Sequence, residues 1–157
     1  MATFNVFEHL IEPIGESLQA DTRFSGINIF YDRTREREVP RDLTPAINYF
    51  LEAPWNDIAR GSGAYSLRSR MFKVKLGFGI WVHDARDAAS MDRRLFEISD
   101  NLFDFFRDNA DFDSSRGIYV DVDEAIAFDV DYSGDDGGYM GTQKLTVGFK
   151  FISGPGK

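Results

Sequence analysis

The chain contains no cysteine, and this absence removes several classes of chemistry. Disulfide bonds, thiolate zinc sites and thiol nucleophiles are all excluded. No apolar run approaches the roughly 20 residues of a membrane span, and the N-terminus lacks a basic region followed by an apolar stretch. We therefore expect a protein of a cytoplasm-like compartment that is held together by packing alone.

Positive charge is also scarce, because 18 Lys and Arg stand against 26 Asp and Glu, a net charge of −8. The acids concentrate in residues 111–136, where nine carboxylates accompany one base, Arg116. A general nucleic-acid binder needs a basic surface. The charge balance therefore argues against that class of protein.

Large aromatic side chains, in contrast, are abundant: aromatics make up 15% of the chain, and Phe alone occurs fifteen times. Each buries much apolar area, so a chain of 157 residues can build an adequate core without cross-links. The sequence has neither internal repeats nor a linker. It therefore predicts one domain over residues 1–157.

Two segments have the three-to-four-residue apolar spacing of an amphipathic helix. In residues 4–19, Phe7 and its apolar neighbours form one stripe for burial, with Pro13 as a kink or early stop. Ser90 is the expected N-cap of a second helix, which runs to about Asn109.

Alternating apolar residues indicate strands between and after these helices. The expected strands lie near residues 27–31, 47–51, 72–82, 118–132 and 145–151. The predicted class is α+β: a mostly antiparallel sheet of about five strands with two helices packed on it. The element order is α-β-β-β-α-β-β, and a long C-terminal hairpin closes the chain.

The connections carry their own expectations. The stretch 32–45 is a loop or a solvated hairpin tip, and 53–70 is a long loop. The fourth strand has fifteen residues and would span roughly 50 Å, so we expect a bulge near Glu124 or a projecting hairpin. Gly77 and Gly79 face away from their strand's apolar stripe, and we expect the first helix or a neighbouring subunit to pack on them.

Residue parity limits the register of the closing hairpin to odd sums of opposed residue numbers. Apolar residues are even-numbered on its first arm and odd-numbered on its second, so directly opposed residue numbers must have an odd sum. A sum of 273 sets Asp129 against Lys144 and Asp123 against Lys150, whereas 275 sets Asp131 against Lys144. Cross-strand ion pairs contribute roughly 0.2–1 kcal/mol each, which favours 273 unless a bulge breaks the second pair.

No group of residues indicates catalysis. Residues 129–135 resemble the start of a calcium loop, but Met140 stands where the motif needs a bidentate Glu, and an exposed acidic turn is the alternative. His9 and His83 are too few for a three-histidine zinc site. Ser62 lacks the surroundings of a nucleophile elbow. We expect no catalytic residue, no cofactor and no metal, and hence no enzyme.

Segments of opposite charge occur in the same chain. Residues 57–75 contain five bases and one acid, and they could contact nucleic acid or an acidic surface on a neighbouring copy. We favour the second, because the acidic segment 111–136 supplies a complementary partner for head-to-tail assembly. The candidate subunit or ring interface comprises Arg33, Arg35, Arg37, Arg41, Arg60, Arg68, Arg70, Asp135, Asp136 and Tyr139.

The order of elements, from the opening helix to the closing hairpin FDVDYSGDDGGYMGTQKLTVGFKFI, resembles the tail terminator or tail-completion proteins of long-tailed bacteriophages. The resemblance covers nearly the whole chain and lies in its layout. It implies a structural subunit of a hexameric ring in the virion neck, assembled in the host cytoplasm. The implied partners are further copies, the tail tube protein, a neck or connector protein and a sheath if the tail contracts, while DNA passes through the lumen without specific binding.

A different class of function also fits the composition. Many Phe residues in an α+β domain could enclose an apolar pocket, so the alternative is a small-ligand- or metal-binding domain. The mass in solution and electron microscopy separate the two hypotheses, because rings support the first and a stable monomer that retains a small molecule supports the second.

The basic segment gives a first prediction. Replacing Arg60, Arg68 and Arg70 with Glu should reduce ring assembly, because the substitutions reverse the charge offered to an acidic neighbour. The thermal unfolding of the monomer should stay nearly unchanged. Light scattering and calorimetry measure the two effects, and equal assembly of both proteins would contradict the prediction.

Overall fold

The computed structural model describes residues 7–32, 39–52, 57–59, 70–113, 118–120, 127–135 and 138–153. The elements are, in chain order, η1 (Phe7–Ile11), α1 (Glu12–Ala20), η2 (Thr22–Phe24), β1 (Asn28–Tyr31), η3 (Arg41–Leu43), β2 (Ala46–Leu51), β3 (Asp57–Ala59), β4 (Arg70–Asp84), α2 (Ala88–Asp108), β5 (Ile118–Val120), β6 (Ala127–Asp135) and β7 (Gly138–Ser153).

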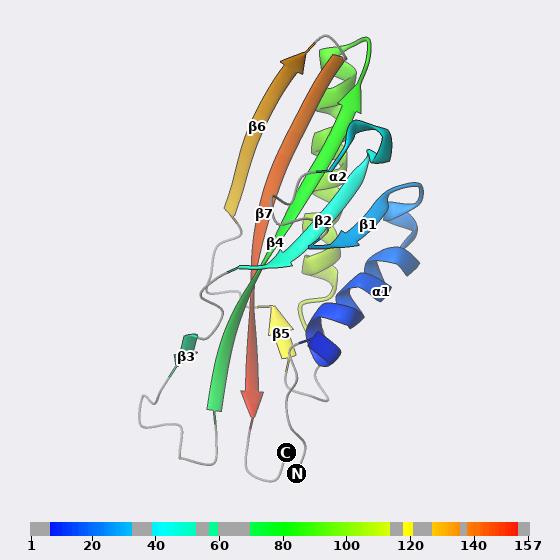
Figure 1. Ribbon diagram of the computed structural model, residues 1–157. Coiled ribbons are helices and arrows are strands. Elements are labelled where there is room, and N and C mark those ends of the chain that lie inside the picture. Colours follow the sequence, from blue (N-terminus) through cyan, green and yellow to red (C-terminus); the bar gives the residue numbers. More distant parts are fainter. Residues whose placement is uncertain are drawn as a thin grey trace.

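In the described part of the chain, seven strands form one mixed sheet with the main order β1-β2-β4-β7-β5, while β3 pairs with β4 and β6 pairs with β7 (Figure 1). Only β1 and β2 pair in parallel among these strands. The expected α+β class, the mostly antiparallel sheet and the C-terminal hairpin are therefore confirmed. The count exceeds the expected five because β3 forms within the expected loop 53–70 and because the expected strand 118–132 is represented by two strands, β5 and β6.

The pairing of β1 with β2 decides between the two expectations for the segment 32–45. Because these strands are parallel, the segment connects them as a crossover, so the hairpin tip is excluded and the loop is not. It also contributes Val39 to the buried residues. Within the expected loop 53–70, residues 57–59 form β3, which pairs with β4, and the remaining residues of that loop up to 69 lie outside the described ranges.

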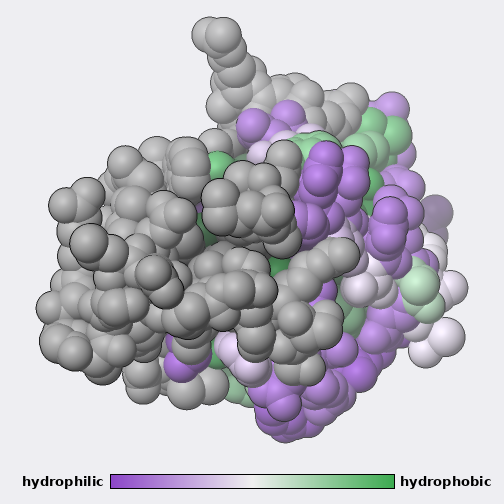
Figure 2. All heavy atoms as spheres, turned by 90° about the horizontal axis from the view of Figure 1, so that it is seen from below, coloured by the Kyte–Doolittle hydropathy of each residue, from purple (hydrophilic) through white to green (hydrophobic). Residues whose placement is uncertain are grey.

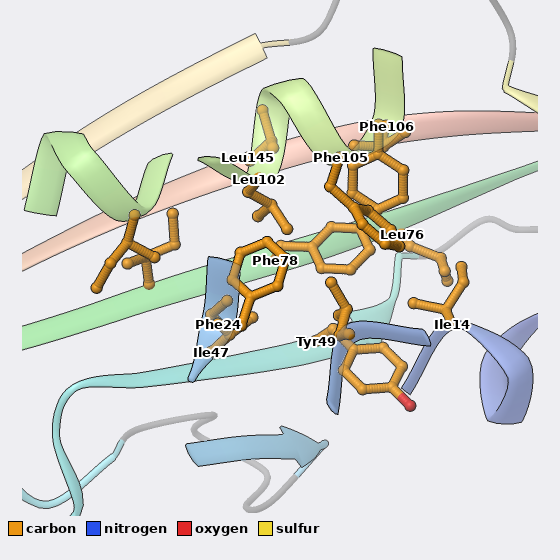
Figure 3. Close-up of a cluster of buried hydrophobic side chains, with 14 of the residues drawn as sticks. Ile14, Phe24, Ile47, Tyr49, Leu76, Phe78, Leu102, Phe105, Phe106 and Leu145 are labelled. Carbon is orange, nitrogen blue, oxygen red and sulfur yellow. The ribbon is translucent and has the colours of Figure 1, made fainter. Parts of the chain in front are cut away.

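Both helices lie on one face of the sheet. The even-numbered residues of β4 from Val74 to Val82 are buried in one cluster with apolar residues of α1 and α2, so the odd-numbered residues face the other side. Figure 3 shows Phe78 of β4 among Tyr49 of β2 and Leu102 and Phe105 of α2. We call the side without helices the open face.

Aromatic rings form a continuous chain through this core. Tyr49 stacks on Phe78 at 5.8 Å between ring centroids, Phe78 contacts Phe106 at 5.0 Å, and Phe106 contacts Phe149 at 5.8 Å. The chain crosses from β2 through β4 and α2 to β7. The high Phe content therefore joins the layers that the sequence predicts.

The first helix begins with a π-helical turn and becomes α-helical at Glu12, with Pro13 in the first turn of α1. The hydroxyl of Tyr49 donates a 2.9 Å hydrogen bond to the carbonyl oxygen of Ile11 at this junction. Burial raises the pKa of Tyr49 to about 12. Phe7, expected in the buried stripe, is 46% exposed, so that expectation is wrong.

The second helix begins earlier than expected. Its N-cap is Asp87, whose carboxylate accepts a 3.0 Å hydrogen bond from the Ala89 backbone N–H. Ser90 lies in the first turn and donates its hydroxyl to Asp87 at 2.7 Å. Asp and Ser are comparable N-caps, so residue type alone could not decide between them.

The closing hairpin has the expected odd register. Ala127 pairs with Thr146 and Asp129 with Lys144, so the sum is 273. The pairing of Asp123 with Lys150 is wrong, because Lys150 lies opposite Tyr119 of β5, where the sum is 269. The sum of paired residue numbers changes from 269 in β5 to 273 in β6, so the expected fifteen-residue strand is divided in two. Because this change is even, residues of the same parity stay on the same face of the sheet.

The two glycines of β4 are covered by rings of the sheet and not by the first helix, while their contact with a neighbouring subunit stays a prediction. A Cβ on Gly77 would lie 2.5 Å from the ring of Phe50 on β2, and a Cβ on Gly79 would lie 3.3 Å from Nε1 of Trp81. Aromatic side chains of the sheet itself therefore lie over the glycine backbone on the open face.

Gly15 of α1 gives a test of the packing against β2. A Cβ at this position would collide with the hydroxyl of Tyr49. Alanine favours a helix by about 1 kcal/mol over glycine, yet Gly15→Ala should lower the free energy of unfolding by about 1–3 kcal/mol through overpacking. Urea denaturation measures this change. In a Tyr49→Phe background the cost should largely disappear, whereas additive effects of the two substitutions would contradict the proposed collision.

Candidate assembly surfaces

The long β4–β7 ladder has two chemically different ends. At one end Arg70 pairs with Ser153, and at the other Asp84 pairs with Tyr139 (Figure 1). Fourteen residue steps at about 3.3 Å separate them, or roughly 45 Å. The register also puts Asp135, the last residue of β6, at the Asp84 end. We call these the basic end and the acidic end.

Two carboxylates at the acidic end are held in the charged form. The backbone N–H groups of Arg86 and Asp87 donate to Asp84 Oδ1 at 2.8 and 2.9 Å, and they lower the pKa of Asp84. Two hydrogen bonds lower the pKa of Asp87: the larger effect comes from the Ser90 hydroxyl and the smaller one from the Ala89 backbone N–H. This end therefore keeps its negative charge at any pH near neutrality.

The hairpin is fitted closely to this end of β4. Gly138 has φ +117°, and a Cβ there would lie 2.6 Å from the carbonyl oxygen of Asp84. Only glycine tolerates both the backbone angle and the close approach. The neighbouring Tyr139 is 42% exposed and lies opposite Asp84 in the register, so an aromatic side chain is exposed at this end.

The open face collects lysines. Lys73 and Lys75 on β4 and Lys144 and Lys150 on β7 all occupy positions of open-face parity, and the chain has only one further lysine, Lys157. Neither composition nor net charge indicates such a grouping.

Lys144 is compensated by its surroundings. Its ammonium group forms an ion pair with Glu52 and lies 5.8 Å from the centre of the Phe50 ring. In the register it also stands directly opposite Asp129. The same Phe50 ring covers Gly77, so these residues form one connected cluster on the open face.

The structure separates the expected interface residues. Arg70 lies at the basic end, whereas Asp135 and Tyr139 lie at the acidic end. Arg41 is exposed in η3, which precedes β2, on the β1–β2 side of the sheet. The remaining expected residues, Arg33, Arg35, Arg37, Arg60, Arg68 and Asp136, lie outside the described ranges.

Exposed aromatic residues were not expected. Besides Tyr139 they are Phe7 and Tyr31, whose rings meet edge-on at 5.8 Å beside β1, and Phe96 and Phe103 on α2. Phe96 and Phe103 are seven residues apart and off the buried stripe of α2, a spacing that the sequence contains. Phe7 has helical spacing and gave no such signal.

The two metal motifs discussed above are not assembled as metal sites within the described ranges. Residues 129–135 belong to β6, an extended strand paired with β7, and do not form a calcium-binding loop between helices. His9 lies in η1 and His83 near the end of β4. Across the described ranges, no group of three or more His, Asp or Glu is placed to hold a metal ion.

In Figure 2, seen from below, the described residues that are visible are mostly hydrophilic, with hydrophobic residues in small separate groups. None of the helices within the described ranges has the length and apolar character needed to cross a membrane.

Comparison with known proteins adds little. No family model matches the sequence, and no curated protein matches it significantly. Twenty-two chains of solved structures match significantly. One of these, which carries no functional name, aligns over 93% of this chain and 92% of its own length, with 10% sequence identity and a TM-score of 0.40. A likeness at this level carries no argument about function.

The cap of α2 gives a prediction with a defined pH dependence. The folded-state pKa of Asp87 is lowered, so its stabilising effect is complete above the unfolded value near 4 and disappears as the pH falls through the folded value. Asp87→Ala should therefore lower the Tm at pH 7, and the difference from the parent should vanish in acid. Calorimetry at several pH values measures this. Asp87→Ser, which retains a capping oxygen, should behave like the parent at pH 7; a Tm difference between the alanine variant and the parent that is independent of pH would refute the assignment.

Proposed function

We propose that this chain is a structural subunit of a homo-oligomeric ring in a bacteriophage tail or neck, of the tail terminator type. The observation that carries the proposal is the separation of charge between the two ends of the β4–β7 ladder. Arg70 marks one end, and Asp84, Asp87 and Asp135 mark the other. A subunit that joins two unlike neighbours needs two unlike ends.

The sides of the subunit also differ from each other. β1 forms one border of the sheet and β6 the other, and they differ in length and in charge. Unlike sides favour heterologous contacts, which generate rings when the rotation between copies closes. The resemblance noted above puts the number of copies at six.

The proposal assigns a neighbour to each end. The basic end would meet an acidic surface and the acidic end a basic one, on the tail tube and on the neck or connector protein. A sheath would be a further partner in a contractile tail. DNA would pass through the lumen without specific binding, and the proposed location is the virion.

Imaging and mass measurement test the proposal directly. Negative-stain micrographs at high protein concentration should show rings, and light scattering should give a mass several times that of the 17.9 kDa chain. Contacts that depend on exposed charge should weaken as ionic strength rises. A monomer at every concentration and salt level would refute the proposal, and a monomer that retains a small molecule would favour the ligand-binding alternative.

A further inference from the structure

The two border strands are oriented so that they can pair across copies. β6 runs antiparallel to β7 and therefore parallel to β4, whereas β1 runs parallel to β2 and therefore antiparallel to β4. β1 and β6 thus run in opposite directions. Rotation about an axis along the strands preserves direction, so β6 of one copy would meet β1 of the next as an antiparallel pair.

The positions whose backbone hydrogen-bonding groups point outward are also compatible between the two border strands. In β1 the Asn28 N–H donates to Pro45 and the Asp32 N–H to Tyr49, so even-numbered positions point to β2 and odd-numbered ones to the border. In β6 two residues separate Asp135 from its partner Gly138, and such a hairpin closes on a hydrogen-bonded pair. Because hydrogen-bonded and non-hydrogen-bonded pairs alternate, even-numbered positions of β6 point to the outer border.

The side-chain faces match in the same register. The border-pointing positions are odd in β1 and even in β6, and on both strands these positions have core-face parity. Pairing them therefore continues the core face and the open face across the joint. If the outward-pointing backbone groups of one border had belonged to its open-face residues, the hydrogen-bonded register would have placed core-face residues of one strand opposite open-face residues of the other.

The rows of residues across the sheet indicate which residue of β1 would lie opposite which residue of β6. Asn28, Ala46, Trp81, Thr142 and Asp131 form one row across the five strands. A neighbour related by rotation without stagger would set its Asn28 opposite Asp131, a sum of 159. A stagger of the strands changes this sum by an even number and leaves the faces unchanged.

Charge favours β1, and not β6 of a second copy, as the strand that pairs with β6. Two β6 borders paired with each other would oppose Asp129 to Asp131, and like charges directly opposite are destabilising. The open-face positions of β1 are Asn28 and Phe30, which carry no charge. Tyr31, the last residue of β1, forms an exposed aromatic pair with Phe7, which supplies apolar surface for a contact.

We infer that β6 of one copy pairs antiparallel with β1 of the next copy, with Asn28 opposite Asp131 or displaced by two residues. The inference rests on the proposed ring and names the contact that closes it. Both helices then lie on one wall of a continuous sheet, and the lysine positions of the open face lie on the other.

Disulfide trapping tests the pairing in a chain that has no cysteine of its own. Asn28→Cys and Asp131→Cys proteins are mixed in equal amounts and oxidised mildly. Non-hydrogen-bonded antiparallel pairs have Cα atoms about 4.5 Å apart, within the range that a disulfide spans. The heterodimer yield should exceed that with Val130→Cys, a position of the opposite face, by at least about tenfold. If the strands are staggered, Asp129→Cys or Ser133→Cys should give the high yield instead.

The Asn28 variant needs a control, because its side chain donates a 2.8 Å hydrogen bond to the Leu43 carbonyl oxygen. Asn28→Ser measures the loss of that bond alone. Phe30→Cys with Asp129→Cys is a second pair of the same register and does not touch it. A chain that carries both Asn28→Cys and Asp131→Cys should give a ladder of covalent multimers up to the size of the ring.

The outcomes separate this contact from the proposed function. Rings in micrographs without parity-dependent cross-links would overturn the strand pairing and leave the ring proposal standing. Equal yields at positions 130 and 131, or Asp131→Cys homodimers in excess of heterodimers, would also overturn the pairing. A monomer that forms neither rings nor cross-links would overturn both.

Discussion

Fifteen consecutive antiparallel residue pairs join β4 to β7, and the described structure is arranged around this ladder. β2, β3, β5 and β6 each pair directly with one of its two strands. Side chains alternate between faces along both strands, so one continuous register assigns each position of the ladder to the core face or the open face. A slip of one residue would move the buried side chains of both strands to the wrong side.

The two faces of the ladder meet different demands. The core face is apolar and receives both helices, and Gly141 lets Met91 of α2 approach the backbone of β7. None of the helices in the described ranges packs on the open face, and rings of the sheet lie over its Gly77 and Gly79. Polar and charged positions then gather around those rings, as the Glu52–Lys144 pair beside Phe50 shows. The same alternation that builds the core therefore also builds the candidate surface.

The sequence predicted what depends on periodicity and missed what depends on the choice of partner. Parity predicted the core positions of β4 and an odd register sum for the hairpin, because an even sum would expose the apolar side chains of one arm. The choice of 273 over 275 came from two ion pairs, of which only the pairing of Asp129 with Lys144 is present in the register. The parallel pairing of β1 with β2 was missed, since a short apolar run does not state which neighbour it joins or in which direction. The exposure of Phe7 was missed for a related reason, because helical spacing identifies a stripe but not where the core ends.

The candidate surface was predicted less completely than the fold. The opposite charge of two segments was visible in the sequence, but the position of Arg70 at one end of the ladder and of Asp135 at the other follows from their pairing with Ser153 and Gly138. The acidic segment is not confined to one end, because Asp113 pairs with Ile118, which lies opposite Phe151 near Arg70. The lysine positions of the open face were missed, because they are distant in sequence and adjacent only across β4 and β7. Contacts between strands that are far apart in the chain carry no local signal.

Charge on the open face bears on what a ring of such subunits could let pass. Polyanion binding depends on cations that neutralise phosphates and release counterions. Lys144 is already compensated by Glu52 and stands opposite Asp129, so this position offers little positive charge to a polyanion. The other lysine positions of this face that lie in the ladder, Lys73, Lys75 and Lys150, are nearer the start of β4, where the register sets Lys73 opposite Lys150. In the proposed ring, the lysine positions of the open face are therefore concentrated toward the basic end, which is the end assigned to an acidic neighbour.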